Sequence, residues 1–493
     1  MKLRTLFIIC LVLMLLYIPI TCSYNGNVND EKSIDYIPPV PTKWKTKNGI
    51  NVIYYRDKEL PIVRASLYIR GSVDKINKLK IKNPLVLEAM GTLLKAGGTK
   101  KYPTEKLNLK LEKLSASLSS SWGSEYGEIS FSSLLEDTEE LFKIVSDMVF
   151  NPSFDKKELE LWKLRKIDSI KRRLDSPSSI AKLKYQNLLY KTSMYGYISN
   201  ENDIKNITQR DLFDAKEKYI KPKDVYLTIV GPITKKKIER LIDTYFQDWK
   251  DYKGKNVSSD DEMIRHNFKP VTKQIYFMKK DDLNQATVFI ISKGPRLDET
   301  MHVKYAVFSS YLGTGGFSSV LVKDLRTNKG LVYTTYGGVF PSVPYGVSTI
   351  FIETSDDKLN NALKSAEKIV SSFKSSENID TNTLKQVKNA MLNAEIFKTA
   401  SYDTLVDRNF TFDFWGFSSN YDKLYKKRVN SFNESDLMEI GNKYMDLDNS
   451  FVVIVASSKA LDNLKDLMKD NESIFSKYNL NLCDVMRDGL CEK

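Results

Sequence analysis

The chain repeats itself at a fixed distance, and this repeat restricts the fold more than any other feature of the sequence. Three pairs of short segments match at one offset of 225 residues. The pairs are Asp211-Leu212 with Asp436-Leu437, Lys218-Tyr219 with Lys443-Tyr444, and Tyr226–Val230 with Phe451–Val455. In both copies a helical pattern ending in Lys-Tyr is followed by a polar turn and a buried-strand pattern. We therefore predict two copies of one domain.

The beginnings of the two copies also correspond. Ala65–Ile69 resembles Ala286–Ile290 at an offset of 221, and Tyr126-Gly127 matches Tyr345-Gly346 at an offset of 219. Small changes in the offset indicate small loop insertions, and a co-linear series of matches argues against chance. Because each copy mixes strand and helix patterns, the predicted fold class is α+β, with two tandem homologous α/β sandwich domains joined by a linker.

The first copy shows where the elements are expected. Enrichment in β-branched and aromatic residues, or alternation, predicts strands over Asn51–Tyr55, Val63–Arg70 and Glu128–Leu134. Thr104 is expected to cap a helix with one apolar face formed by Leu107, Leu111, Leu114 and Leu118. Further helices are expected from Thr138, over Lys157–Leu174 and over Ile180–Leu189.

Length and composition fit this plan. The 493 residues suit two domains, and 42% hydrophobic residues suit a globular protein with a large core. The net charge of +13 comes from Lys and Arg interleaved with Asp and Glu, without an isolated basic block, so we expect no nucleic-acid partner. The expected boundaries are a signal peptide at 1–23, a polar spacer at 24–42, a first domain at 43–250, a linker at 251–270, a second domain at 271–480 and a tail at 481–493.

The N-terminal segment is typical of an exported protein. Lys2 and Arg4 precede an apolar run from Leu6 to Ile20. Cleavage after Ser23 and lipidation of Cys22 both remain open, so the expected location is the periplasm, either free or as a membrane-anchored lipoprotein. Export would also allow Cys483 and Cys491 to form a disulfide bond.

One stretch of the second copy carries the candidate chemistry. Gly315–Tyr333 reads GGFSSVLVKDLRTNKGLVY, in which a loop of small residues leads into a predicted helix over Phe317–Leu325. Asn328-Lys329-Gly330 is expected to end this helix, and Leu331–Tyr336 is expected to form a strand. The Gly-rich loop lacks the Gly-Lys-Ser/Thr ending of a phosphate-binding loop.

This stretch resembles the second-domain motif of the M16 zinc metallopeptidases, the family of pitrilysin, insulinase and mitochondrial processing peptidase. The resemblance covers about residues 43 to 480 and implies domains of the LuxS/metallohydrolase-like type. By the same resemblance Arg326 and Tyr333 would be catalytic, holding the substrate carbonyl and stabilising the oxyanion. Gly315, Gly316, Ser318 and Ser319 would contact substrate. Val320 departs from the Arg or Lys of many relatives. The same residue types would also suit an Arg326–carboxylate ion pair and a half-buried Tyr333.

The His-x-x-Glu-His zinc motif of the family is absent. In the family this motif precedes a Gly-Thr pair, and counting back from Gly98-Thr99 leads to Ala89–Lys95. There Thr92 and Leu93 fall near the positions of the Glu and the second His. The distal-ligand region, Leu164–Ile170, offers only Asp168, and Glu88 is interpreted as an ordinary helix carboxylate. The two histidines, His266 and His302, are expected at the surface. We therefore expect no metal in this chain, and zinc in a partner.

These observations favour a zinc-free subunit of a heterodimeric M16-type peptidase. It would close the chamber of a zinc-bearing His-x-x-Glu-His homologue that cleaves peptides, and would be inactive alone. Two alternatives stay open: a non-proteolytic scaffold protein of the same fold, and an exported peptide-binding protein that works without a partner.

Overall fold

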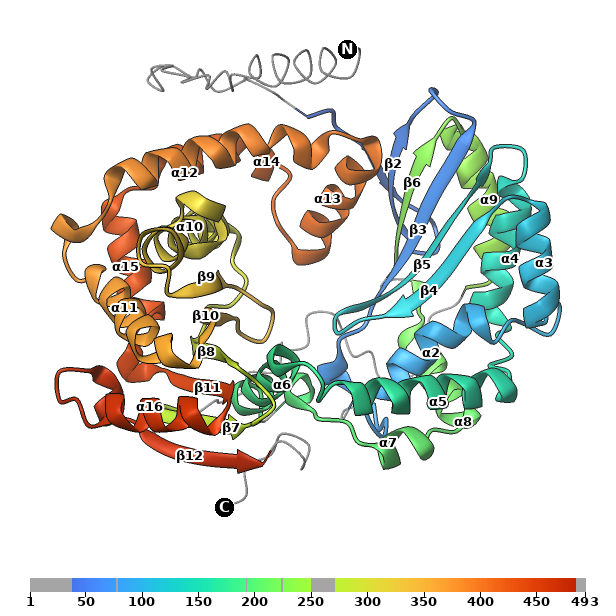
Figure 1. Cartoon of the computed structure of the whole chain (residues 1–493). Coiled ribbons are helices and arrows are strands. Elements are labelled where there is room, and N and C mark those ends of the chain that lie inside the picture. Colours follow the sequence, from blue (N-terminus) through green and yellow to red (C-terminus); the bar gives the residue numbers. More distant parts are fainter. Residues whose placement is uncertain (1–37, 77–78, 192, 223–224, 250–270, 485–493) are drawn as a thin grey trace, which may run out of the picture. The chain divides into compact units, whose positions relative to one another are not determined.

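The computed structural model of the chain describes residues 38–76, 79–191, 193–222, 225–249 and 271–484 (Figure 1). The strands of the first half are β1 (Thr42–Lys45), β2 (Asn51–Arg56), β3 (Ile62–Arg70), β4 (Ser117–Trp122), β5 (Tyr126–Leu134) and β6 (Val225–Gly231). Those of the second half are β7 (Gln274–Lys279), β8 (Gln285–Lys293), β9 (Val332–Phe340), β10 (Val347–Ser355), β11 (Phe451–Ala456) and β12 (Asn479–Asp484).

The α-helices also divide between the two halves. The first half contains α2 (Leu85–Ala96), α3 (Thr104–Lys113), α4 (Thr138–Phe150), α5 (Lys156–Arg172), α6 (Pro177–Leu189), α7 (Glu201–Lys205), α8 (Gln209–Tyr219) and α9 (Lys235–Phe246). The second half contains α10 (Glu299–Ser309), α11 (Leu359–Ser372), α12 (Thr381–Ala394), α13 (Tyr402–Trp415), α14 (Tyr421–Ser431), α15 (Glu434–Tyr444) and α16 (Ser458–Met468).

Each half builds one six-stranded mixed sheet, and the two sheets have matching topology. The strand order is β1-β2-β6-β3-β5-β4 in the first sheet and β12-β7-β11-β8-β10-β9 in the second. In both sheets the central strand pairs one neighbour in parallel and the other antiparallel. Only the outermost strands differ, since β1 is antiparallel to β2 whereas β12 is parallel to β7. The α+β class and the two-domain plan expected from the repeat are confirmed.

The repeated residues do the same work in both halves. Asp211 and Asp436 each complete a capping box at the start of α8 and α15. Each also forms an ion pair with a lysine from an earlier segment, Lys82 at 3.2 Å and Lys304 at 2.6 Å. In each box the carboxylate at the third helical position accepts a hydrogen bond from the backbone N–H of the N-cap residue, and its charge suits the helix dipole. The 225-residue repeat thus preserves a helix start and its attachment.

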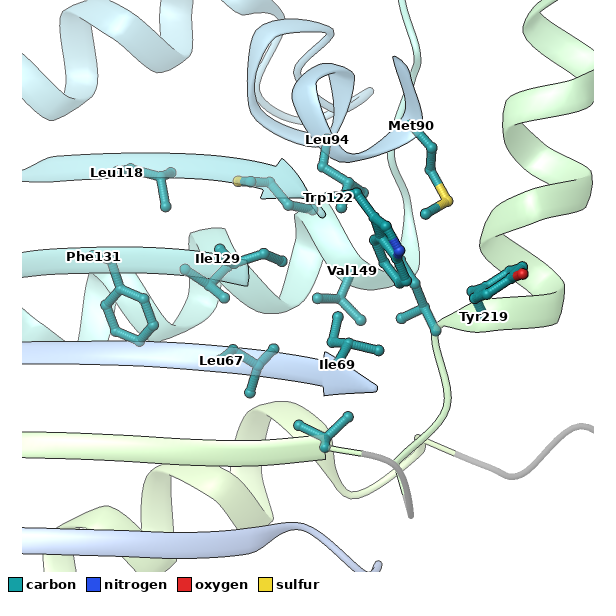
Figure 2. Packing of buried hydrophobic residues seen from close by; sticks show 14 of the residues in the cluster. Leu67, Ile69, Met90, Leu94, Leu118, Trp122, Ile129, Phe131, Val149 and Tyr219 are labelled. Carbon is teal, nitrogen blue, oxygen red and sulfur yellow. The ribbon is translucent and has the colours of Figure 1, made fainter. Parts of the chain in front are cut away.

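The core of the first half closes around Trp122 at the end of edge strand β4. Its ring lies among Met90, Leu94, Ile69 and Tyr219 (Figure 2). The indole Nε1 donates a hydrogen bond to the Gly71 carbonyl oxygen at 3.2 Å.

Two glycines let the backbone approach this ring. A Cβ atom at Gly127 would lie 2.2 Å from the Trp122 ring, and one at Gly91 would lie 2.5 Å from the Trp122 backbone nitrogen. Because interiors are close-packed, such contacts cannot be absorbed without moving a strand or helix. Gly91 therefore sets the distance between α2 and β4.

Each half contributes one helix that packs on the sheet of the other half. On α6, Ile180, Ala181 and Leu189 join a buried cluster with residues of β7, β8, β10 and β11 in the second sheet. On α13, Val406, Phe410 and Phe414 join a cluster with residues of β2, β3 and β6 in the first sheet.

Polar and aromatic contacts accompany this exchange. The Tyr345 hydroxyl donates to the Leu189 carbonyl oxygen at 2.5 Å, and Arg64 pairs with Asp403 at 2.7 Å. The Tyr68 ring stacks on Phe410 with ring centres 3.8 Å apart. Helix α6 starts at Pro177 and α13 at Tyr402, so the exchange also follows the 225-residue repeat.

Helix α6 buries a lysine beneath the second sheet. Lys184 is 4% exposed, and its Nζ lies 5.0 Å from the centre of the Tyr276 ring. Within the described part of the chain no carboxylate pairs with it. Burial, assisted by repulsion from Lys191, lowers the pKa of Lys184 from 10.5 to about 8.

The structure corrects several expected positions. Leu118 lies in β4 and not on the face of α3, so the strand Ser117–Trp122 was missed. Its serine-rich sequence has low β-propensity, and pairing with β5 stabilises it. Thr104 is the first residue of α3 and not its cap; its hydroxyl donates to the Ala96 carbonyl oxygen at 2.8 Å. Helix α5 ends at Arg172, before the expected Leu174.

Other expectations fall partly or wholly outside the described residues. The signal at 1–23 with Cys22, the linker at 251–270 with His266, and Cys491 lie there. Strand β12 continues to Asp484, past the expected end of the second domain, and Cys483 within it is disulfide-bonded. Among the described helices, none is long and apolar enough to cross a membrane.

We predict that Gly127→Ala destabilises the fold, because its methyl group would collide with the Trp122 ring. The expected loss in the free energy of unfolding is about 1–3 kcal/mol, measured by urea denaturation. Gly123→Ala is the matched control, since a Cβ there would only reach a 3.6 Å contact with the Tyr126 carbonyl oxygen. Equal stability of the two variants would contradict the close packing around Trp122.

We also predict that Lys184→Met stabilises the protein at pH 7. Between about pH 8 and 10.5 the lysine is protonated in the unfolded chain but largely neutral in the folded one. Burying Lys184 therefore lowers the free energy of unfolding most below pH 8 and least above pH 10.5. The variant should gain about 1–3 kcal/mol at pH 7, and the gain should shrink as the pH rises through that interval.

The control is Lys182→Met, which changes an exposed lysine of the same helix. Urea denaturation of the three proteins at pH 7 and at higher pH gives the comparison. A stability difference between wild type and Lys184→Met that is independent of pH would show that this ammonium group is not held in a desolvated site.

Candidate functional site

The Gly-rich loop of the second half is fixed against edge strand β9. The segment η5 (Ser310–Thr314) brings Gly313 so close that a Cβ there would lie 2.2 Å from the Gly337 backbone nitrogen. Ser319 is fully buried, and both its backbone N–H and its hydroxyl donate to the Gly316 carbonyl oxygen, at 3.0 and 2.6 Å. Gly316 has φ +70°, which favours glycine. The loop is therefore a rigid turn with its own internal hydrogen bonds.

The helix that carries Arg326 starts later than the sequence predicts. Phe317 lies in the short turn η6 (Gly316–Ser318), and Ser319 is extended, so regular helix begins at Val320. It continues as the π-helical segment η7 (Val322–Asn328), which contains Arg326. The expected helix over Phe317–Leu325 is thus wrong at its start, because the hydrogen bonds of Ser319 compete with helix formation.

The end of this helix agrees with the prediction. Gly330 adopts φ +57°, and the Leu331 N–H donates to the Leu325 carbonyl oxygen at 2.7 Å. Strand β9 then begins at Val332 and packs beside η7. The chain therefore returns Tyr333 to the side of the segment that bears Arg326.

A bulge determines how Tyr333 is presented. Thr334 pairs with Glu353 and Val332 with Thr354, so Tyr333 is the extra residue between two regular pairs of β9 and β10. Bulges redirect side chains and are common beside functional sites. Tyr333 is 56% exposed at this position.

Both predicted catalytic side chains are free to bind a ligand. The Arg326 guanidinium lies 5.3 Å from the centre of the Phe317 ring. Within the described residues neither Arg326 nor the Tyr333 hydroxyl forms an ion pair or a hydrogen bond. Asp324, the nearest carboxylate in sequence, instead binds Lys329 at 2.8 Å. The alternative of a local ion pair and a half-buried tyrosine does not describe this geometry.

The four predicted substrate-binding residues have different environments. Gly315 and Gly316 are exposed, and the Ser318 hydroxyl donates to the Gly315 carbonyl oxygen at 3.2 Å. Ser319 is buried, so any contribution it makes is to the shape of the loop. Direct contact with a ligand stays a prediction for the other three.

Sequence reasoning missed Phe317, the aromatic residue beside Arg326. The sequence analysis placed it at the start of a predicted helix and gave it no role, yet it is 72% exposed. The signal that could have revealed it is the preceding Gly315-Gly316 pair, which disfavours continuous helix.

At the position that the resemblance assigns to zinc, the side chains offer no set of metal ligands. Ala89 and Leu93 of α2 are buried in the same apolar cluster as Ile170 of α5. Zinc requires nitrogen, sulfur or carboxylate donors, and the side chains of Ala89 and Leu93 have none. The residues present do not fit a zinc ion.

The polar residues around this position bind one another. Glu88 forms an ion pair with Lys166 at 2.6 Å, and the Thr92 hydroxyl donates a hydrogen bond to the Glu88 backbone carbonyl oxygen at 2.9 Å. Asp168 pairs with Arg172 at 3.0 Å. Within the described residues no cluster of three His, Cys, Asp or Glu side chains could hold a metal ion.

His302 has a structural role that the sequence did not indicate. It was expected at the surface but is half-buried, with Nδ1 bound to the Tyr421 hydroxyl at 2.6 Å and its ring edge-on to Phe417. Burial, reinforced by Lys398, Arg408 and Arg428, lowers the pKa of His302 below its usual 6.5. The neutral imidazole connects α10 to α14.

Both halves of the chain match known sequence families. Residues 93–194 match the insulinase family (peptidase family M16), and residues 206–391 match the peptidase M16 inactive domain.

Two curated proteins are similar in sequence. The uncharacterized zinc protease YmxG of Bacillus subtilis is 23% identical over 271 residues, which is 54% of this chain and 63% of that protein. An uncharacterized zinc protease of Rickettsia bellii is 22% identical over 46% of this chain and 53% of its own length. The matches therefore span less than two thirds of these relatives.

Solved structures share the fold. The peptidase M16 inactive domain from Pseudomonas fluorescens aligns with a TM-score of 0.72 and 17% identity over 85% of this chain and 98% of its own. A protease from Helicobacter pylori aligns with a TM-score of 0.69 and 16% identity over 85% of this chain and 100% of its own. The ferredoxin protease FusC aligns with a TM-score of 0.66 and 14% identity over 87% of this chain and 48% of its own. With the motif, the repeat and both family matches in agreement, this chain belongs to the M16 peptidase family.

Proposed function

We propose that this chain is the zinc-free subunit of a heterodimeric M16-type peptidase. It closes the chamber of a zinc-bearing partner and supplies Arg326 and Tyr333 to the partner's site. The observation that carries the proposal is a contrast between two regions. Arg326 and Tyr333 are exposed and without polar partners among the described residues, whereas the zinc-ligand positions are filled by Ala89 and Leu93.

The first part of this contrast argues for a ligand. An exposed guanidinium beside a carboxylate normally forms an ion pair, but Asp324 is already bound to Lys329. Arg326 therefore keeps its planar set of N–H donors for a carbonyl or carboxylate oxygen. Tyr333 offers a second, exposed donor at the bulge of β9, the strand that packs beside η7.

These two donors suit the stabilisation of an oxyanion. During peptide hydrolysis, negative charge develops on the carbonyl oxygen of the cleaved bond. Fixed donors lower the energy of that charge most when water is excluded. Zinc in the partner would supply the attacking water and polarise the same carbonyl. This chain's contribution is to orient the peptide and to bind the developing charge.

The size of the chain is consistent with half of a larger enzyme. FusC aligns over 48% of its length, which leaves room in that protein for a second unit of similar size. We propose that a His-x-x-Glu-His homologue provides the corresponding unit here, with unfolded peptides as substrates. From the N-terminal segment we propose export to the periplasm, with a lipid anchor at Cys22 as a variant of the same location.

The proposal is tested by isolating the tagged protein from its native cells. We expect a His-x-x-Glu-His homologue to co-purify and the complex to cleave peptides in a chelator-sensitive way. The chain alone should show no cleavage and no stoichiometric zinc by atomic absorption. A chain that purifies without a partner and is inactive would favour the scaffold or the peptide-binding alternative.

In the assembled complex, we predict that Arg326→Ala and Tyr333→Phe each lower kcat by about 10²–10³-fold, with zinc content and assembly unchanged. The matched controls are Arg210→Ala and Tyr197→Phe, which alter side chains that are also exposed but belong to the first half. Full activity of both site variants in an intact complex would contradict the proposed function and favour a scaffold.

A further inference from the structure

We propose that Phe317 is a specificity-determining residue, whose ring contacts an apolar side chain of the peptide next to the carbonyl held by Arg326. This inference rests on the proposed function and names the substrate class within it: peptides with a large apolar residue close to the cleaved bond.

The first observation is the exposure of Phe317. Its side chain is 72% exposed, on the turn η6. The turn on which it sits is closed by the hydrogen bonds of Ser319 to the Gly316 carbonyl oxygen, and a Cβ at Gly316 would meet nothing within 4 Å. The Phe317 ring is thus exposed at the surface beside the Arg326 guanidinium. Exposing a large aromatic ring loses the benefit of burial, and a ligand that covers it would recover that benefit.

The second observation is that other exposed aromatic side chains belong to the same segment. Tyr333 is 56% exposed and Tyr336 is 38% exposed. Phe317 lies on the η6 turn, and Tyr333 and Tyr336 lie on β9, all within 20 residues of sequence. Both elements contact η7. Aromatic rings beside a charged donor suit a peptide, which offers both carbonyl groups and apolar side chains.

The third observation gives the position of the contact along the peptide. The Arg326 guanidinium lies 5.3 Å from the centre of the Phe317 ring. An extended peptide advances about 3.3 Å per residue. If Arg326 binds one carbonyl, the ring reaches the side chain one or two residues away. The attraction between guanidinium and ring keeps the two groups in this relation.

A purely supporting role for Phe317 makes a different prediction. If the ring only held Arg326 in place, its removal would slow cleavage of every peptide by the same factor. If it contacts substrate, the loss depends on the peptide. Phe317→Leu separates the two roles further, because leucine keeps an apolar surface but has no π-system to attract the guanidinium.

The experiment uses the assembled complex and an unstructured fluorogenic peptide whose cleavage site has been mapped by mass spectrometry. Versions of this peptide carry either Leu or Gln at the two positions on each side of the cleaved bond. We expect Phe317→Ala to raise KM for one of the Leu peptides about tenfold and to change KM for the matching Gln peptide less than about twofold. Phe317→Leu should keep KM for that Leu peptide near the wild-type value.

The matched control is Phe397→Ala, since Phe397 is 76% exposed and lies outside the Gly315–Tyr336 segment. It should leave the kinetic constants of both peptides unchanged. Circular dichroism and thermal unfolding of each variant verify that the fold is intact.

Equal effects of Phe317→Ala on the Leu and Gln peptides at every position would overturn the inference. So would unchanged KM values throughout. Failure of the proposed function has a separate signature, because Arg326→Ala and Tyr333→Phe would then also leave cleavage intact. An active complex that depends on Arg326 but is indifferent to Phe317 would refute only the specificity role.

Discussion

The reciprocal packing of α6 and α13 is the interaction on which the rest of this structure depends. Each sheet is covered by helices of its own half on one face, and part of its other face is apolar. That second apolar surface is covered by a helix from the opposite half, so neither half buries its own sheet completely. Because leaving such surface in water is unfavourable, the two halves stabilise each other. The rigid placement of β9, and of the site residues on it, follows from a sheet that is buried in this way.

Two regions of the fold differ in whether their polar side chains are available to bind a ligand. On α2 and α5, Ala89, Leu93 and Ile170 belong to the apolar core, Glu88 pairs with Lys166 and Asp168 pairs with Arg172. Between η7 and β9, Arg326 and Tyr333 are presented without polar partners among the described residues. A buried apolar cluster stabilises the fold on its own, whereas free donors on a rigid bulged edge gain stability only from a ligand. This difference is why we propose that peptidase activity belongs to an assembly with a zinc-bearing partner and not to the isolated chain.

Much of the architecture was predictable because it follows from pattern. The period of the repeat, the alternation in β3 and β5, and the capping residues of α8 and α15 are local properties of the chain. The errors occurred where local preference was overruled. The serine-rich strand β4 forms because β5 pairs with it and α2 packs on it, and the helix after Gly316 starts late because Ser319 bonds within the loop. His302, polar and near a helix start, was expected at the surface, but Phe417 and Tyr421, the first residue of α14, pack against it.

The sequence by itself determined the two-domain α+β plan, the candidate pair Arg326 and Tyr333, and the lack of histidine ligands for zinc, since these depend on residue identity and spacing. Only the tertiary structure decided that Arg326 has no ion pair among the described residues, that Tyr333 is the extra residue of a bulge, that Ser319 is buried and that Phe317 is exposed. The physical reason is that exposure and pairing depend on which distant segments meet. Asp324 could have bound Arg326 by sequence proximity, but it pairs with Lys329 and accepts a hydrogen bond from the Ser365 hydroxyl of the distant helix α11 at 2.7 Å.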